Sequence, residues 1–325
     1  MFSKYGIPYK GSKSRLADKI IDYMPAANNF IDLFAGGCAM TQAAAQCGKY
    51  SAVYTNDLCQ MPVRLFLRAC AGDLPPIRWV SRAEFLANAA TDPIAAYCWS
   101  FGNCARTYIF GRELEDWKHA LFNARVFGDF SMFKKMNINT NGTTADIKAN
   151  IAEYKAKYVE YYTATNGHDA KAVARLERYA DYWRIEGLDR LLRLQQLNGT
   201  PTDKIKTSFV DYRAVPVPPN SVIYCDIPYI GKKGTRTAEY MADGGMANEF
   251  SHADFYKWAA EQTAPVFVSS YDMPADEFVR VLNVSIFSGY GRGARPVSEG
   301  LFVPIHQYKA DKPRGYQFTI FDYCE

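Results

Sequence analysis

Six residues in the second half of the chain, Tyr224 to Tyr229, place an acid, a proline and a tyrosine directly after an apolar run. An exocyclic amine on a nucleobase is a poor nucleophile, because its lone pair is delocalised into the ring. Asp226 is able to accept one N–H of such an amine, and the carbonyl of Ile227, on the bend made by Pro228, the other. Both acceptors favour the pyramidal amine that attacks an electrophilic methyl group. Tyr229 is suited to stack on a base that has left its duplex.

A strand must present these residues, and the preceding sequence predicts one. Ser221–Val222–Ile223–Tyr224–Cys225 is apolar and β-branched, and it follows the turn signal Pro218–Pro219–Asn220. Asp226 therefore falls at the carboxyl end of a buried strand, where open α/β sheets bind ligands. Taken alone, Asp226–Tyr229 is equally typical of a strand end with a proline turn, so its interpretation depends on the rest of the chain.

The first part of the chain predicts a nucleotide-binding βα unit. A strand over Phe30–Phe34 leads into the turn Ala35–Gly36–Gly37–Cys38 and a helix from about Met40 to Cys47. Glycines let the backbone approach a ligand closely, and a helix N-terminus favours polar or negative ligand groups. A second strand, Ser51–Thr55, leads to Asp57. Because Asp57 lies about 20 residues past the turn, where an acid meets ribose hydroxyls, we expect a nucleotide-like ligand.

Lys13 occupies a position that helix physics disfavours. Ser12 is the expected N-cap of a helix that reaches about Met24. Lys13 would then lie in the first turn, where the helix dipole opposes a cation. It requires solvent or an anionic partner, and on the helix pattern alone a solvated lysine is the simpler interpretation.

Composition and charge are those of an ordinary soluble protein with one positive region. The 325 residues are 48% hydrophobic and 22% charged, with a formal net charge of +4. The positive excess lies in the segment from Ser100 to Lys206, which contains 17 basic and 13 acidic residues. This excess favours an anionic partner.

The eight cysteines form no Cys-x-x-Cys pair and the four histidines are far apart, so we expect reduced thiols and no metal site. Without an 18-residue apolar run or a signal-peptide core, we expect a cytoplasmic protein with no membrane contact.

The middle of the chain is mostly helical. The spacing of apolar residues predicts helices over about 61–71, 82–90, 94–101, 113–125, 145–163 and 168–198. A polar loop over 127–144 carries Lys134 and Lys135, side chains of a kind that reaches DNA phosphates and base edges. Such a loop is equally ordinary as a solvated surface.

After Gly199 the α/β pattern returns. A strand over Lys206–Val210 ends at Asp211 and Tyr212, and the Cys225 strand follows. Two Gly-rich loops come next, a long one with Lys232, Lys233 and Arg236 and a later one, 289–300, with Arg292. Between them we expect a helix over 252–262, a strand over 265–270, a helix from about Ala275 and a strand over 284–287. The chain would close with a hairpin of 301–303 and 316–321. The predicted fold is therefore an α/β, doubly wound sheet (residues 1–60 and 205–325) with a helical insertion (61–204).

These motifs together resemble the Dam-like class of DNA N6-adenine methyltransferases, and they follow the order of that family. The matching stretches are Tyr9–Lys10–Gly11–Ser12–Lys13, Phe30 to Gly37, Asn56–Asp57, Asp211–Tyr212, Asp226–Ile227–Pro228–Tyr229, Phe250 to Trp258 and Val266–Phe267–Val268–Ser269. The resemblance covers both α/β parts and implies a mixed seven-stranded Rossmann-like methyltransferase sheet. The insertion matches in position and helical character.

The resemblance also implies roles for individual residues. S-adenosylmethionine would be the methyl donor, S-adenosylhomocysteine the product, double-stranded DNA the substrate, and no metal would take part. The implied cofactor-binding residues are Tyr9, Lys13, Asp32, Phe34, Gly36, Asp57, Asp211, Tyr212 and Asp226. The implied catalytic residues are Asp226, Ile227, Pro228 and Tyr229, with the insertion reading sequence and the basic residues above touching DNA.

The chain departs from the family pattern at two positions. Ile227 replaces the first proline of Asp-Pro-Pro-Tyr, and Cys38 stands where the cofactor turn usually ends in glycine. A degenerate DNA-binding relative without turnover therefore remains an alternative, as do methylation of cytosine N4 and of a protein amide. A nicotinamide-binding protein is disfavoured, because the turn lacks G-x-G-x-x-G spacing.

Overall fold

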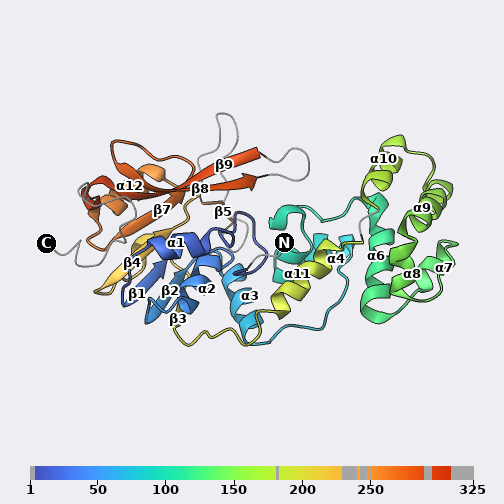
Figure 1. Ribbon diagram of the computed structural model, residues 1–325, viewed down its shortest axis with the longest axis horizontal. Coiled ribbons are helices and arrows are strands. Elements are labelled where there is room, and N and C mark those ends of the chain that lie inside the picture. Colours follow the sequence, from blue (N-terminus) through green and yellow to red (C-terminus); the bar gives the residue numbers. More distant parts are fainter. Residues whose placement is uncertain are drawn as a thin grey trace. The chain divides into compact units, whose positions relative to one another are not determined.

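A computed structural model describes residues 4–180, 183–228, 240–241, 247–248, 250–288 and 295–308 of the chain (Figure 1). The chain divides into two compact units. The first, which we call the α/β unit, comprises Met1–Asp73 and Leu197–Glu325. The second, the helical unit, comprises Leu74–Gln196.

Seven strands of the described residues form one sheet in the α/β unit. They are β1 (Asn29–Asp32), β2 (Ala52–Asn56), β3 (Ile205–Ser208), β4 (Ser221–Cys225), β7 (Val266–Ser270), β8 (Phe278–Ser288) and β9 (Arg295–Pro304). Their order is β3-β2-β1-β4-β7-β9-β8. The first five run parallel, whereas β9 pairs antiparallel with β7 and with β8. The predicted α/β class with a mixed seven-stranded sheet is confirmed.

Alternate side chains of the central strands enter two separate hydrophobic cores. Phe30, Val222 and Phe267 pack in one core with α1 (Ala17–Tyr23) and α2 (Ala39–Gln46). The adjacent residues Ile31, Ile223 and Val268 pack in the other with α12 (His252–Glu261). β4 is buried along its full length, as is typical of a parallel strand that is covered on both faces. The helices therefore cover both faces of the sheet (Figure 1).

The helical unit contains the helices that follow α3 (Gln60–Cys70). They are α4 (Arg82–Asn88), α5 (Pro93–Cys98), α6 (Arg112–Phe127), α7 (Ser131–Lys135), α8 (Thr144–Ala149), α9 (Ile151–Asn166), α10 (Ala170–Tyr179) and α11 (Glu186–Gln195). Short 3-10 turns are η1 (Phe101–Asn103) here, and η2 (Tyr212–Ala214) and η4 (Ile305–Gln307) in the α/β unit. A two-stranded ladder joins β5 (Tyr240–Met241) and β6 (Ala247–Asn248).

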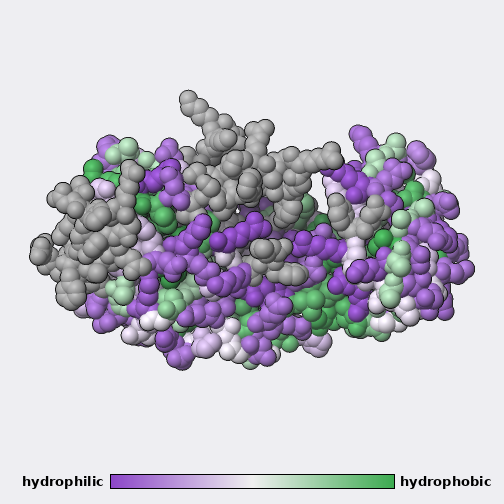
Figure 2. All heavy atoms as spheres, in the orientation of Figure 1, coloured by the Kyte–Doolittle hydropathy of each residue, from purple (hydrophilic) through white to green (hydrophobic). Residues whose placement is uncertain are grey.

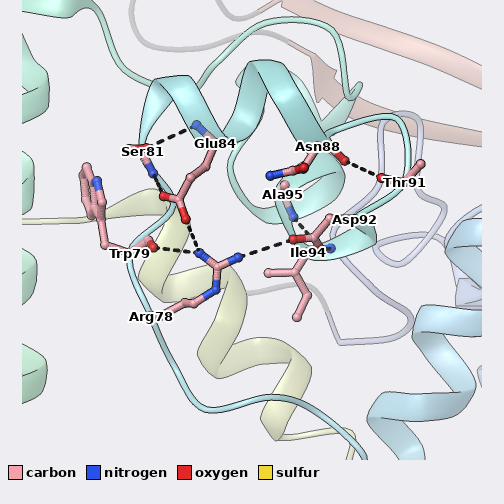
Figure 3. A network of polar contacts seen from close by, with 9 residues as sticks. All are labelled: Arg78, Trp79, Ser81, Glu84, Asn88, Thr91, Asp92, Ile94 and Ala95. Atoms are coloured by element: carbon pink, nitrogen blue, oxygen red, sulfur yellow. Dashed lines mark hydrogen bonds and ion pairs between the residues drawn. The ribbon is translucent and has the colours of Figure 1, made fainter.

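Capping side chains fix where α4 and α5 begin (Figure 3). Ser81 and Glu84 form a reciprocal capping box at α4, and Asp92 accepts the backbone N–H of Ile94 at α5. The Arg78 guanidinium lies 2.9 Å from Glu84 and 3.6 Å from Asp92, so one cation joins both caps. The Arg78 and Glu84 side chains of this network are exposed to solvent. On the face drawn in Figure 2, hydrophilic residues predominate among the described residues.

The single helix predicted over 168–198 is wrong, because the structure contains two helices there. Side chains of α6 bind the backbone carbonyls between them. Trp117 donates to Ala180 (2.9 Å), Lys118 to Arg184 (2.8 Å) and Arg125 to Trp183 (3.2 Å). Carbonyls bound in this way are withdrawn from intrahelical pairing, so the helix stops after α10 and restarts at α11.

Other local predictions also differ from the structure. The helix expected from Ser12 begins at Ala17; the Ser12 hydroxyl accepts the Ser14 N–H at 3.4 Å, and a turn in which the Lys13 carbonyl accepts from Leu16 and Ala17 precedes the helix. The helix expected near Ala275 is a single turn in which Pro274 accepts from Phe278, which begins β8. The loop expected over 289–300 is strand from Arg295 onward, and the loop over 127–144 contains α7.

No helix in the described ranges is both long and apolar enough to traverse a bilayer. Among the same residues, no group of three or more histidine, cysteine or acidic side chains is arranged to hold a metal ion.

Candidate active site

The acid after β4 lies at the carboxyl edge of the sheet. Asp226 is partly exposed, whereas Ile227 and Pro228 are buried. The Ile227 side chain packs in the core under α12. The isoleucine that replaces a family proline is therefore held by packing rather than by a ring. Tyr229 lies outside the described residues.

Lys13 forms an ion pair with Asp226. Its ammonium lies 2.7 Å from each carboxylate oxygen and donates to the carbonyl of Gly11 at 3.2 Å. Burial lowers the pKa of Lys13, but Asp226 and Glu299 raise it by more, so the net pKa is above its ordinary value. The lysine is 5% exposed and cationic, and the solvated interpretation of Lys13 is wrong.

Glu299 is a second carboxylate at the same ammonium. It extends from β9, is 4% exposed, and its Oε1 lies 3.1 Å from Lys13 Nζ. The same oxygen accepts a hydrogen bond from Ser269 of β7 at 2.8 Å. Three neighbouring strands, β4, β7 and β9, thus direct polar groups to one point of the sheet edge.

The glycine turn after β1 is enclosed by the N-terminal segment. Gly36 donates its N–H to Asp57 Oδ2 at 2.7 Å, and Asp57 Oδ1 accepts from Cys59 at 2.9 Å. A Cβ on Gly36 would lie 2.7 Å from the Tyr9 ring, and one on Gly37 would lie 2.5 Å from Tyr9 Cβ. Both glycines are therefore needed for this close approach. Burial raises the pKa of Tyr9 well above its ordinary value, so its hydroxyl stays protonated.

Cys38 takes the left-handed conformation that the family glycine would adopt. Its φ is +60° and its side chain is buried. A residue with a Cβ is strained in this region, at a cost of about 1–2 kcal/mol. The turn keeps the glycine geometry although glycine is absent.

Asp32 is a buried acid with one unsatisfied oxygen. Its Oδ2 accepts from Thr41 at 2.7 Å, while Oδ1 has no hydrogen-bond partner among the described residues. Burial raises the pKa of Asp32 to about 7. A buried acceptor without a donor is suited to a ligand that brings one.

A cavity of about 300 Å³ lies beside the ends of β1, β2 and β3, and its size is at the lower end for small-ligand sites. Its lining includes Phe34, Tyr212 and Phe250, whose rings pack against one another. Asp211 also lines it and is paired with Arg213 at 2.8 and 3.0 Å. The Arg213 guanidinium lowers the pKa of Asp211, which is therefore a charged acceptor at neutral pH.

Nearly all predicted cofactor residues meet in this region of the α/β unit. Tyr9 and Asp57 contact the glycine turn, Asp32 lies below it, Phe34, Asp211 and Tyr212 line the cavity, and Lys13 joins Asp226. Of the predicted DNA-binding residues, Lys134 and Lys135 are exposed at the end of α7 in the helical unit. Lys232, Lys233, Arg236 and Arg292 lie outside the described residues.

Sequence reasoning missed Glu299, Ser269 and His252. A His252 ring nitrogen (Nε2) lies 2.7 Å from the carbonyl oxygen of Pro228, next to the catalytic turn. The signal for Glu299 was an acid two residues before the apolar run Leu301–Val303, but the predicted strand began only at Leu301 and left Glu299 in a loop. His252 and Ser269 lie in stretches that resemble the family, but nothing in their residue types or spacing assigned them a role.

The sheet order, renumbered within the sheet as 3-2-1-4-5-7-6, and the polar edge define a Rossmann-like methyltransferase. The model of the D12 class N6 adenine-specific DNA methyltransferases matches residues 9–283, and the chain belongs to that family. No curated protein matches the chain. The resemblance to Dam-like enzymes is confirmed: the protein methylates adenine N6 in DNA and uses S-adenosylmethionine.

Proposed function

We propose that the edge of the sheet around Asp226 methylates an adenine flipped out of a specific site in double-stranded DNA. The observation that carries this proposal is the ion pair of Lys13 and Asp226, which lies at the carboxyl end of β4. Ligands of open α/β sheets bind at these ends, where the strand order reverses. Here the order reverses between β1 and β4.

Two acceptors would act on the amine of the target adenine. The ion pair with Lys13 stabilises the carboxylate form of Asp226. A carboxylate accepts hydrogen bonds and cannot donate them. The carbonyl of Ile227 accepts the second N–H. When bound, S-adenosylmethionine supplies an electrophilic methyl group. As positive charge develops on the amine, the fixed negative charge of Asp226 stabilises it, so neither a covalent intermediate nor a metal is required. Pro228 fixes the bend and Tyr229 stacks on the flipped base.

The region around the glycine turn fits the cofactor. The cavity of about 300 Å³ has an aromatic wall and a charged acceptor, Asp211, as an adenine amine requires. Asp57, which accepts the Gly36 N–H, would meet the ribose hydroxyls, and the Asp32 oxygen that has no partner among the described residues would accept from donor groups of the cofactor. We therefore assign cofactor binding to these three acids with Tyr9, Lys13, Phe34, Gly36 and Tyr212.

The helical unit would read the DNA sequence. Its candidate contact surface, besides Lys134 and Lys135, is the tip 101–107, which an isolated bridge between Ser100 and Tyr108 closes. Phe101 is 64% exposed at this tip, and Arg106 is also exposed. Within the tip, Asn103 donates to the carbonyl of Tyr97 (2.7 Å) and Ala105 donates its N–H to the Ser100 hydroxyl (3.1 Å). An exposed aromatic with a neighbouring arginine suits stacking and base-edge contact. The protein would act as a monomer or weak dimer in the cytoplasm of a bacterium or a phage-infected host.

Product identification tests the proposed reaction. The protein is incubated with labelled S-adenosylmethionine and mixed-sequence duplex DNA, and the digested nucleosides are separated. We expect N6-methyladenine from the wild type and none from Asp226→Ala. Labelled N4-methylcytosine would instead assign cytosine as the target. Cofactor binding without transfer to DNA would favour a degenerate binder or a protein substrate.

Substitutions at the tip test its proposed role in sequence recognition. If the wild type prefers one duplex sequence and Phe101→Ala or Arg106→Ala weakens that preference, the result would support the tip as the part that reads the sequence.

A further inference from the structure

Arg213 donates three hydrogen bonds to the carboxylate of Asp211 in the wall of the cavity. Its backbone N–H and its Nε donate to Oδ1 at 2.9 and 2.8 Å, and its Nη2 donates to Oδ2 at 3.0 Å. An ionised carboxylate has about four acceptor sites, shared by its two oxygens. Both sites of Oδ1 are therefore used, whereas Oδ2 keeps one site that no donor among the described residues occupies.

The geometry of this pair fixes the direction of the remaining acceptor site. Asp211 caps η2, and its carbonyl accepts the N–H of Ala214 at 2.9 Å, so its backbone is held as well. The two bonds from the guanidinium fork set the plane of the carboxylate. The side chains of Arg213 and Asp211 are 57% and 42% exposed, and such an exposed pair adds little to stability. What Arg213 determines is therefore the orientation of the carboxylate.

We propose that Arg213 is a positioning residue that aims one acceptor site of Asp211 at the 6-amino group of the cofactor's adenine. The proposal rests on the assignment of this cavity to the cofactor. Asp211, Tyr212 and Arg213 line the cavity together, so a purine against the aromatic wall lies within reach of Oδ2. An amino group at position 6 donates to this oxygen, whereas a hydrogen atom there has nothing to donate. Arg213 thus makes the site select a 6-aminopurine without itself donating to the base.

A general structural role for Arg213 predicts a different result. Its guanidinium lies 5.5 Å from the centre of the Tyr212 ring, so it also shapes the wall of the cavity. If shape were its only contribution, loss of Arg213 would weaken ligands with and without the 6-amino group by the same factor. If Arg213 aims Asp211, its loss weakens only the ligand that carries the amine. Lysine separates charge from orientation, because it keeps the positive charge but lacks the planar fork.

The test is titration calorimetry of the full chain with S-adenosylhomocysteine and with its analogue that carries hydrogen in place of the 6-amino group. The wild type should prefer the amino ligand by about tenfold, the order expected for one hydrogen bond to a charged acceptor. Arg213→Gln and Arg213→Lys should each reduce this preference to about threefold or less, and Asp211→Ala should remove it. Arg68→Gln breaks an exposed pair with Asp73 in the same unit, and this matched control should keep the full preference.

Each result bears on the proposal. Equal weakening of both ligands by Arg213→Gln would overturn the orienting role, and so would a full preference in Arg213→Lys, because charge alone would then suffice. If the glutamine variant does not fold, the lysine variant and the wild type decide. A wild type that binds S-adenosylhomocysteine without preferring the amine would refute this inference alone. A preference that survives in Asp211→Ala, or a wild type that binds neither ligand, would overturn the proposed cofactor site as well.

Discussion

Lys13 and Asp226 lie 213 positions apart in the chain, yet the lysine ammonium is 2.7 Å from both oxygens of the carboxylate. One residue precedes the first helix and the other follows β4. The contact requires the N-terminal segment to cross the carboxyl edge of the sheet, where the Ser14 hydroxyl accepts from Tyr5 and the Gly37 carbonyl accepts from Ile7. The segment that carries Lys13 is therefore part of the site.

Lys13→Met should abolish activity and weaken the fold. Two carboxylates, Asp226 and Glu299, would face each other without their common cation. Breaking a buried pair costs about 3–5 kcal/mol, and methyl transfer should fall at least about a hundredfold. Chemical denaturation and a methyl-transfer assay measure the two effects. Lys10→Met, at an exposed neighbouring position, is the matched control and should behave as wild type. An active and stable Lys13→Met protein would contradict the role of the pair.

Asp32 should make stability depend on pH. Burial raises its pKa from 3.8 to about 7, so between these values the folded protein binds a proton that the unfolded chain does not. Stability therefore falls as pH rises from about 4 to 7. Asp32→Asn cannot ionise and so does not lose stability in this way. The free energy of unfolding of the variant minus that of the wild type should rise by on the order of 2–4 kcal/mol between about pH 4 and 7 and level off above about pH 7.

Thermal unfolding at pH 5, 6, 7 and 8 measures this difference. Asp18→Asn is the control, because its ion pair with Lys4 lowers the pKa of Asp18. The stabilisation from a lowered acid pKa is lost only as pH falls below its unfolded value, so this control should give a flat difference between pH 5 and 8. A flat difference for Asp32→Asn as well would show that Asp32 is ionised throughout.

Gly36→Ala should disturb the cofactor turn. The added Cβ would lie 2.7 Å from the Tyr9 ring, at a φ of +45°. Strain and displacement of the ring should together cost about 1–3 kcal/mol and weaken cofactor binding. Gly48→Ala shares the positive φ but meets open space, so it isolates the strain alone. Equal effects of the two substitutions on cofactor affinity would exclude a special role for the contact with Tyr9.

His252→Ala should slow transfer without weakening cofactor binding. The ring lies 2.7 Å from the Pro228 carbonyl and steadies the turn that carries Asp226 and Ile227. We expect about a tenfold lower maximal rate, with partial recovery in His252→Gln, which keeps a donor. His306→Ala, an exposed histidine in η4, is the control. A lower cofactor affinity at an unchanged maximal rate would place His252 in cofactor binding instead.

The residues that follow parallel strands could be predicted from the sequence. Asp57, Asp211 and Asp226 each come after a short predicted strand, and the carboxyl ends of parallel strands share one edge, so their convergence followed from topology. Glu299 could not be found in this way, because β9 runs antiparallel and brings its first half to that edge. The break between α10 and α11 also lacked a local signal, since side chains of α6 cause it.

Two predicted positions depended on resemblance rather than on pattern. Helix rules favoured a solvated Lys13, and only the partners across the sheet made its burial favourable. Cys38 has the left-handed backbone that a glycine adopts easily, and a sequence rule based on propensity would not place a cysteine there.

A single-turnover measurement with Asp226→Asn tests the central claim most directly. The substitution keeps the size of the side chain and one acceptor oxygen but removes the charge that pairs with Lys13. With DNA and S-adenosylmethionine both saturating, we expect the rate of methyl transfer to adenine to fall at least about a hundredfold, while the affinity for DNA changes by no more than a few-fold. A transfer rate within a few-fold of wild type would contradict the assignment of Asp226 as the group that receives the adenine amine.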